Sequence, residues 1–274
     1  MIAGFFDRLA AAIERSGSRL CVGLDPHLGG VPAEELAAFN RRLIEATAEF
    51  ACCYKPNIAF YEARGEAGMR ALRETLAAVP PDLPVILDAK RGDIGSTAEA
   101  YAAALFDDLG ADAATVNPYL GHDALAPFLQ RDDRGVYILC RTSNPGAADL
   151  QDLHVETASG ERLPLYLVVA DYARQWNARG NIGVVVGATY PRELAAIRIR
   201  CPELPLLIPG VGVQGGALEE VVETAENGKP AGFVVSVSRA IVEAARPGED
   251  PFVAARAAAR RYRDAIAAAA RARR

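Results

Sequence analysis

The 274-residue sequence is poor in lysine: it has only Lys55, Lys90 and Lys229, against 27 arginines. Acidic side chains outnumber basic ones by 35 to 30, and the resulting net charge of −5 argues against a generic nucleic-acid or membrane-surface binder. No run of about 18 uninterrupted apolar residues occurs, so no membrane span is predicted. Because arginine has replaced lysine almost everywhere, each remaining lysine calls for a reason.

Cysteine and histidine are also scarce. The five cysteines, at 21, 52, 53, 140 and 201, form no CxxC pair and no Cys/His spacing typical of a metal site. We therefore expect buried, reduced thiols in a cytoplasmic, metal-free protein. Residues 1–20 have acidic and basic side chains within their apolar pattern, which predicts an amphipathic helix rather than a signal peptide.

The sequence does contain a series of short runs rich in Val, Ile and Leu. Such nearly continuous apolar runs are typical of parallel strands buried on both faces. Segments with helical spacing lie between them, for example 33–49, 97–109 and 217–226. Eight strands alternating with helices predict an α/β fold, a (β/α)8 barrel, although an open doubly wound sheet is an alternative. The expected strands are 19–25, 52–59, 83–89, 112–117, 136–142, 182–187, 204–209 and 232–237.

Two segments differ from this alternation. The longest irregular stretch, 143–162, follows the fifth strand and is interpreted either as an active-site loop or as a plain solvated insertion. The run 252–274 is rich in alanine and has seven arginines, which favours an outer barrel helix over a basic arm for nucleic acid. No linker divides the chain, so we expect residues 1–274 to form a single domain.

The third strand ends in an acid–base–acid sequence, Asp88-Ala89-Lys90-Arg91-Gly92-Asp93. Function in a barrel gathers at the carboxyl ends of the strands, and alternation along a strand places Asp88 and Lys90 on the same side. Gly92 would then permit a sharp turn that carries Asp93 away. A helix N-cap is the structural alternative for Asp93, but the capping-box pattern Ser96-Thr97-Ala98-Glu99 makes that role unnecessary.

A second lysine follows the neighbouring strand, in Tyr54-Lys55-Pro56-Asn57. A lysine can give up a proton, whereas the pKa of arginine is too high for it to serve as an acid. Adjacent charges tune a lysine for proton donation. We therefore expect Lys55 and Lys90 to take part in proton chemistry, while Lys229, between Gly228 and Pro230, indicates a surface turn.

The seventh strand leads into a glycine-rich segment, Pro209 to Gly216, that matches G-x-G-x-x-G. As a dinucleotide motif this match is weak, because it lies late in the chain and no acidic residue follows about 20 positions later. A phosphate site fits better, with glycine amides and a helix N-terminus on one side and Arg239, after the eighth strand, on the other. A merely structural turn is the remaining alternative.

Together these motifs resemble the orotidine 5′-phosphate decarboxylases, in particular the longer bacterial type (the type 2 subfamily). The resemblance extends from about Leu20 to Ile241 and is most specific over residues 87–97. It implies a homodimeric barrel without cofactors that converts orotidine 5′-monophosphate to UMP and CO₂, the last step of de novo UMP synthesis. The supporting motifs are Gly23-Leu24-Asp25-Pro26, Tyr54-Lys55-Pro56-Asn57, Thr142-Ser143-Asn144-Pro145-Gly146-Ala147 and Pro209 to Gly216.

The resemblance also implies a role for each residue of the site. Lys90 would protonate C6 as CO₂ leaves, Asp88 would lie against the substrate carboxylate, and Lys55 would orient Asp88 and touch the ribose. Asp93, from the partner subunit, would complete this charge array. At the ribose, the implied substrate contacts are Asp25 of the same subunit and the partner subunit's Thr97. The other implied contacts are Ser143 at the pyrimidine, Gln214, Gly215 and Arg239 at the phosphate, and Pro209 and Ser238 beside them.

Two rival functions stay open at this point. The motif D-x-K-x-x-D is shared with 3-keto-gulonate-6-phosphate decarboxylases and hexulose-phosphate synthases, which use magnesium and an acidic residue where this chain has Lys55. A catalytically silent sensor of phosphate ligands that keeps the barrel is the second rival.

Overall fold

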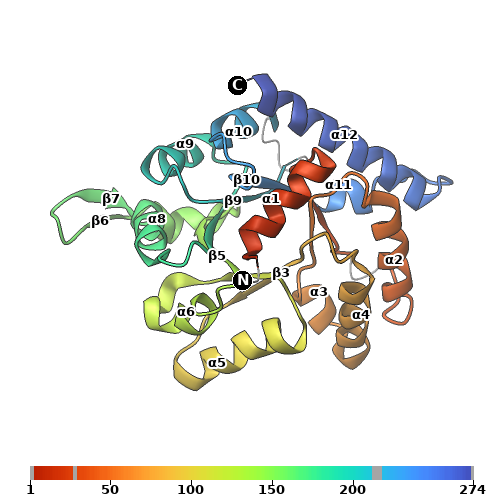
Figure 1. The fold of residues 1–274 in the computed structure, drawn as a ribbon, viewed down its shortest axis with the longest axis horizontal. Helices are drawn as coiled ribbons and strands as arrows, with labels where there is room; N and C mark the ends of the chain where they lie inside the picture. The colour runs from red at the N-terminus through yellow and green to blue at the C-terminus, as the bar shows by residue number, and fades with distance from the viewer. Residues whose placement is uncertain (1–2, 27–29, 212–217, 273–274) are drawn as a thin grey trace.

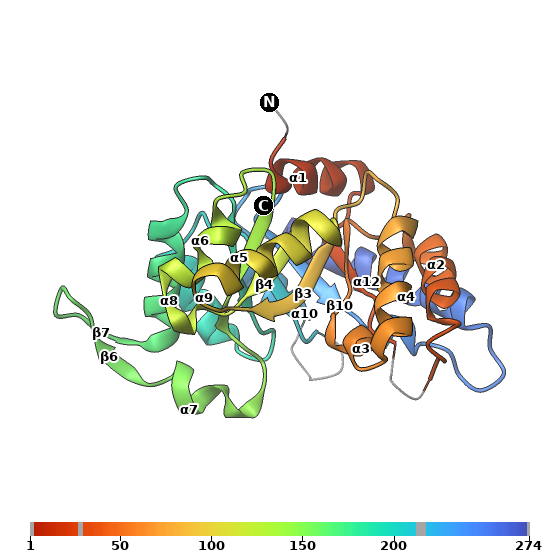
Figure 2. The ribbon, with the colours of Figure 1, turned by 90° about the horizontal axis from the view of Figure 1, so that it is seen from below.

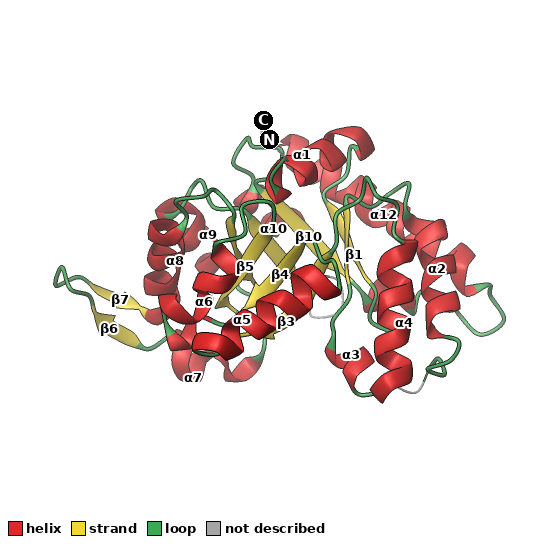
Figure 3. Cartoon of the chain, turned by 60° about the horizontal axis from the view of Figure 1, so that its bottom comes forward, coloured by secondary structure: helices red, strands yellow, loops and turns green. Residues whose placement is uncertain are grey.

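The strands form a parallel barrel in the computed structural model, which describes residues 3–26, 30–211 and 218–272. Eight strands pair in the order β2-β1-β10-β9-β8-β5-β4-β3, and the bridges Tyr54–Val85 and Asn57–Asp88 join β2 to β3. A ring of helices encloses these strands (Figure 3), so the predicted barrel is confirmed. The strands are β1 (Leu20–Gly23), β2 (Cys53–Lys55), β3 (Ile86–Arg91), β4 (Ala113–Val116), β5 (Gly135–Arg141), β8 (Ile182–Val186), β9 (Leu206–Pro209) and β10 (Phe233–Val237).

The outer helices bury apolar side chains toward the strands. In the alanine-rich helix α12 (Pro251–Ala272) most of these side chains are small: it buries Ala255, Ala258 and Ala259 and leaves its arginines outside, as predicted. A face of small residues lets a helix lie close to its neighbours. The other helices of the ring are α2 (Leu36–Thr47), α3 (Ala59–Glu62), α4 (Gly65–Ala78), α5 (Gly95–Ala103), α6 (His122–Leu129), α8 (Leu165–Trp176), α9 (Pro191–Arg200), α10 (Leu218–Ala225) and α11 (Arg239–Val242).

One end of the barrel is closed by the amphipathic helix α1 (Phe5–Ser16), which crosses it in Figure 1. Phe5, Leu9 and Ile13 pack there against strand residues such as Ile86. A Cβ atom on Gly135, the first residue of β5, would come within 2.2 Å of the Phe5 ring, so only glycine admits this packing. Because this is the amino-terminal end of the strands, a site can open only at the opposite, carboxyl-terminal end.

The segment 143–162 is more regular than predicted. It contains the 3₁₀ turn η3 (Pro145–Ala147), helix α7 (Ala148–Gln151) and strand β6 (His154–Glu156), which pairs antiparallel with β7 (Arg162–Pro164). The resulting hairpin projects from the barrel in Figure 2. The prediction of an irregular stretch was wrong because elements of three or four residues are too short to show a hydrophobic period.

The predicted capping box is also wrong. Helix α5 begins at Gly95, its N-cap residue is Ile94, and no side chain caps it. Asp93 instead accepts a hydrogen bond from the neighbouring Ile94 N–H at 2.8 Å. Gly92 is needed for a close approach to Asn117 rather than for a sharp turn, because a Cβ atom on residue 92 would lie 2.8 Å from the Asn117 carbonyl oxygen.

The helix predicted over 97–109 continues past α5 as the π-helical turn η1 (Ala104–Asp108), and the 3₁₀ turn η2 (Pro118–Leu120) follows β4. All five cysteines are buried and unbridged, as predicted. Within the described ranges, no helix combines the length and the apolar character needed to cross a membrane.

Candidate active site

Two lysines share one carboxylate at the carboxyl-terminal end of the barrel. Asp88 Oδ1 accepts a hydrogen bond from Lys90 Nζ at 2.6 Å, and Asp88 Oδ2 accepts one from Lys55 Nζ at 3.0 Å. Asp25, just after β1, lies 3.9 Å from the Lys55 ammonium and accepts the Asn57 N–H at 2.7 Å. Side chains from three neighbouring strands therefore form one charge array, as the positions of Asp88, Lys90 and Lys55 at strand ends predict.

The two lysines of the array differ in how deeply they are buried. The Lys55 side chain is 6% exposed and that of Asp88 12%, whereas that of Lys90 is 48% exposed. Burial by itself lowers the pKa of Lys55, but the carboxylates of Asp88 and Asp25 outweigh it and leave that pKa raised. Burial by itself raises the pKa of Asp88, yet the charges of Lys55 and Lys90 hold that pKa well below its usual range. Lys55 and Asp88 are thus both charged near neutral pH.

A buried threonine that the sequence analysis did not single out completes the array. Thr115, on β4, donates its hydroxyl to Asp88 Oδ1 at 2.9 Å and accepts the Lys90 backbone N–H at 3.0 Å. A threonine among the small residues of a buried strand gives no signal in one sequence, because valine fills the same space.

The array opens into a cavity of about 470 Å³. Ser143 and Pro209 line it, which places two of the predicted substrate contacts beside the array. The remaining lining residues are Lys55, Asp88, Lys90, Thr115, Leu139, Thr142, Asn144, Gln151, Val185 and Leu207.

The loop that carries Ser143 is held by its own hydrogen bonds. Gln151 accepts the Thr142 N–H at 2.8 Å and donates to the Thr142 hydroxyl at 2.9 Å. Arg141, fully buried at the end of β5, pairs with Asp152 at 3.1 Å and stacks on the Tyr190 ring. Part of the segment 143–162 therefore forms a wall of the cavity.

The predicted phosphate site is described only in part. Gln214 and Gly215 lie outside the described residues. Arg239 opens α11 with an exposed side chain, and Ser238 precedes it with a buried hydroxyl that has no hydrogen-bond partner in the described part of the chain. A Cβ atom on Gly23 would lie 2.4 Å from the Ser238 Cβ, so β1 can approach the end of β10 this closely only because residue 23 has no side chain.

Two predicted site residues lie apart from the array within one chain. Thr97 is exposed on the first turn of α5, and Asp93 bonds to its neighbour Ile94. Among the described residues, no hydrogen bond or ion pair joins Asp93 or Thr97 to Lys90 or Asp88.

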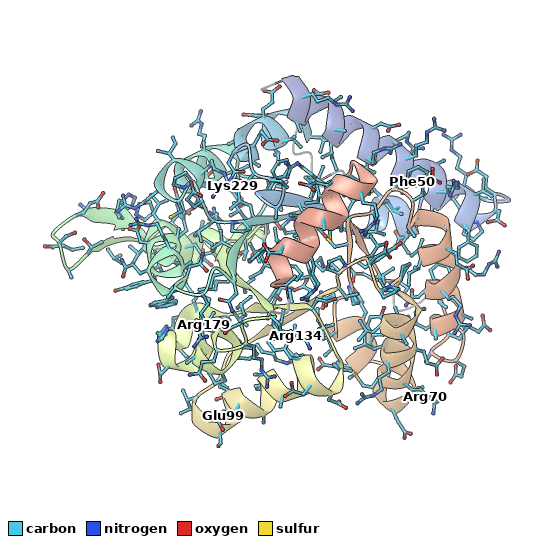
Figure 4. The ribbon with its side chains drawn as sticks, in the orientation of Figure 1. Phe50, Arg70, Glu99, Arg134, Arg179 and Lys229 are labelled. Atoms are coloured by element: carbon cyan, nitrogen blue, oxygen red, sulfur yellow. The ribbon has the colours of Figure 1, made fainter. Side chains whose placement is uncertain are left out.

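The third lysine is at the other end of the barrel. Lys229 lies just before β10, on the side of the molecule that faces the viewer together with α1 (Figure 4). Its exposed ammonium pairs with Glu203, which confirms the predicted surface position.

The geometry defines a class of protein: a (β/α)8-barrel enzyme with its polar site at the carboxyl ends of the strands. Residues 18–251 match the model of the "Orotidine 5'-phosphate decarboxylase / HUMPS family". The chain belongs to this family.

Individual relatives resemble the chain over nearly its whole length. A protein of Roseiflexus castenholzii named orotidine 5'-phosphate decarboxylase is 54% identical, and the match covers 98% of this chain and 99% of the relative. A protein of the same name from Thermomicrobium roseum is also 54% identical, over 96% of this chain and 94% of the relative. Among solved structures, the OMP decarboxylase of Leishmania donovani is 43% identical with a TM-score of 0.86, covering 98% and 99% of the two chains.

Proposed function

We propose that this chain decarboxylates orotidine 5′-monophosphate to UMP and CO₂ in the cytoplasm, the last step of de novo UMP synthesis, without a cofactor. The observation that carries this proposal is the Asp88 carboxylate held between Lys90 at 2.6 Å and Lys55 at 3.0 Å, at the edge of a cavity. The names of the relatives supply the substrate.

Lys90 is the proposed proton donor. As the bond between C6 and the carboxylate breaks, the electron pair stays on C6 and CO₂ leaves. The Lys90 ammonium stabilises the developing carbanion and then transfers a proton to C6. Because its side chain is 48% exposed, Lys90 can regain that proton from water, whereas the buried Lys55 cannot.

The other members of the array position Lys90. Asp88 fixes the ammonium at a defined place, and Lys55 in turn fixes Asp88. Leu139, Val185 and Leu207 line the same cavity with apolar surface, which strengthens these electrostatic interactions by excluding water.

The substrate contacts follow the family resemblance. Asp25 holds a ribose hydroxyl and Ser143 the pyrimidine, with Pro209 beside it. The phosphate is bound by Gln214, Gly215, Ser238 and Arg239. The exposed Arg239 guanidinium and the Ser238 hydroxyl leave donors for a phosphate, and the segment 143–162 serves as an active-site loop.

A homodimer with shared sites would bring Asp93 and Thr97 of the partner subunit to each array. Exposed apolar side chains support this assembly, because Ile94 is 61% exposed and Tyr119 80%. Both lie where β3 and β4 end, two strands joined there by the hydrogen bond from the Asn117 N–H to the Arg91 carbonyl. Such a patch beside Asp93 fits a subunit interface.

The magnesium-dependent rivals fit this donor set poorly. Three donors already occupy the Asp88 carboxylate: the ammonium groups of Lys55 and Lys90 and the hydroxyl of Thr115. The two ammonium groups lie about 3 Å from the carboxylate, so their positive charges would repel a divalent cation bound there.

A direct assay tests the proposed function. Purified protein mixed with orotidine 5′-monophosphate should release CO₂ and form UMP, with the same rate in EDTA as in magnesium. Lys90→Ala should lower turnover by at least about 10³-fold and still bind UMP, because the proton donor acts in the transition state rather than in binding. No turnover by the wild type, or loss of turnover in EDTA, would refute the proposal.

A further inference from the structure

The backbone of Lys90 has a conformation that its surroundings must hold in place. Its φ of +48° makes it the one non-glycine residue with positive φ in the described ranges. The pairing of β3 with β4 shifts register between Leu87 and Arg91, so the strand ladder does not fix the residues between them. A non-glycine residue with this backbone conformation is strained, and such a conformation persists only where neighbouring groups hold it in place.

The Thr115 hydroxyl replaces the missing ladder partner. It lies on β4, opposite the irregular part of β3, and accepts the Lys90 backbone N–H at 3.0 Å. The residue is 1% exposed, so a hydroxyl there would be costly unless both of its hydrogen-bonding functions were satisfied.

The hydroxyl also orients the carboxylate. Because it accepts from the Lys90 N–H, its single proton is free to be donated to Asp88 Oδ1, 2.9 Å away. That oxygen is the one that binds the Lys90 ammonium at 2.6 Å. One hydroxyl thus contacts both ends of the same lysine, its backbone directly and its ammonium through Asp88.

We propose that Thr115 is a positioning residue for the decarboxylation, whose hydroxyl fixes the Lys90 backbone and the Asp88 carboxylate so that the ammonium is held facing the substrate. This inference rests on the proposed function, because it requires Lys90 to be the proton donor. It adds a residue of β4 to an array that otherwise comes from β1, β2 and β3.

Substitutions that separate the hydroxyl from its volume test this role. Thr115→Val keeps the shape and removes both hydrogen bonds, and should lower kcat by about 10- to 100-fold, the factor expected for one charge-assisted hydrogen bond. KM should change by less than about threefold, because Thr115 acts on the proton donor rather than on binding. Thr115→Ser retains the hydroxyl and should have most of the wild-type kcat.

A control removes a buried hydroxyl elsewhere. Thr75, in α4, is buried and accepts a hydrogen bond from the Asn40 amide at 3.0 Å, away from the cavity. Thr75→Val should lower the melting temperature without changing kcat. If Thr115→Val does not fold, Thr115→Ser and Thr115→Ala provide the comparison, since both lose the methyl group and only one loses the hydroxyl.

A double variant separates positioning from general stability. Added to Lys90→Ala, Thr115→Val should lower the residual turnover no further, because the group through which it acts is gone. A wild-type kcat in Thr115→Val, equal kcat values for Thr115→Ser and Thr115→Ala, or an additive loss in the double variant would overturn the inference. Absence of turnover in the wild type would instead refute the proposed function, a result that the same assay distinguishes.

Discussion

Three lysines in this chain occupy three different electrostatic environments. Lys55 is buried between two carboxylates, Lys90 is half-exposed and bonded to one, and Lys229 pairs with Glu203 on the surface. A buried ammonium depends on its partners, because an uncompensated buried charge is strongly unfavourable. An exposed ion pair contributes little, since water solvates both charges when the pair separates.

Removal of the buried ammonium should therefore destabilise the protein in a pH-dependent way. Lys55→Met leaves Asp88 short of one partner at neutral pH and should lower the free energy of unfolding by about 3 kcal/mol, as for a broken buried pair. The folded-state pKa of Asp88 is lowered, so this stabilisation is present above its unfolded pKa near 3.9 and is lost as the pH falls further. The folded-state pKa of Lys55 is raised, so the stabilisation that the charged Lys55 contributes is lost only above about pH 10.

Denaturant titrations at about pH 7 and pH 3 measure this difference. The gap between wild type and Lys55→Met should shrink at the lower pH. Lys229→Met is the matched control and should change the free energy of unfolding by less than about 1 kcal/mol at both pH values. Equal destabilisation by the two substitutions would contradict the electrostatic reading of Lys55.

At the scale of elements, the connection after β5 combines a rigid part with a projecting part. Its first residues are tied to α7 by the two hydrogen bonds between Gln151 and Thr142. The hairpin β6–β7 is anchored separately, through Arg200, which pairs with Glu161 and Asp171 at 2.8 Å each. The residues next to Ser143 are thereby fixed independently of the hairpin.

Loss of the Gln151 side chain should loosen the loop that carries Ser143. Gln151→Ala removes the two hydrogen bonds with Thr142, of about 1 kcal/mol each, and a longer one from Arg141 at 3.5 Å. It should raise KM for orotidine 5′-monophosphate about tenfold. The melting temperature should fall by several degrees at most, because α7 lies at the surface and buries no residue. Gln175→Ala, at an exposed position of α8, is the control, and an equal effect of both substitutions on KM would argue against this role for Gln151.

At the scale of the whole molecule, the barrel has two unlike ends. Helix α1 covers the amino-terminal end (Figure 2). The array and its cavity occupy the other end. The exposed apolar residues Ile94, Tyr119 and Leu120 follow the ends of β3 and β4, near the array. A second subunit bound there would cover apolar surface and bring its own Asp93 toward the cavity.

Mixed subunits test whether two chains share each site. Asp93→Ala and Lys90→Ala proteins should each be nearly inactive alone. After subunit exchange, about one quarter of the wild-type activity should return, because half of the dimers are mixed and each has one intact site. Failure to recover activity, with exchange verified by mass spectrometry of the intact dimers, would place the function of Asp93 within its own subunit.

Much of this molecule follows from the sequence alone. All eight strands were predicted because residues buried on both faces leave an unbroken apolar run, and the ends of those strands located Asp88, Lys90 and Lys55. Lys229 was recognised as a surface residue from its turn-forming neighbours. These features are local, and local side-chain chemistry determines them.

Tertiary structure decided the rest. The capping box failed because a matching pattern does not fix where a helix begins, and α5 begins at Gly95. The role of Gly92 depends on the approach of the Asn117 carbonyl, and that of Thr115 on a register shift between two strands. A hydroxyl can serve Lys90 and Asp88 together only when β4 lies beside β3. One sequence does not reveal such a contact, because it joins residues about 25 positions apart through space.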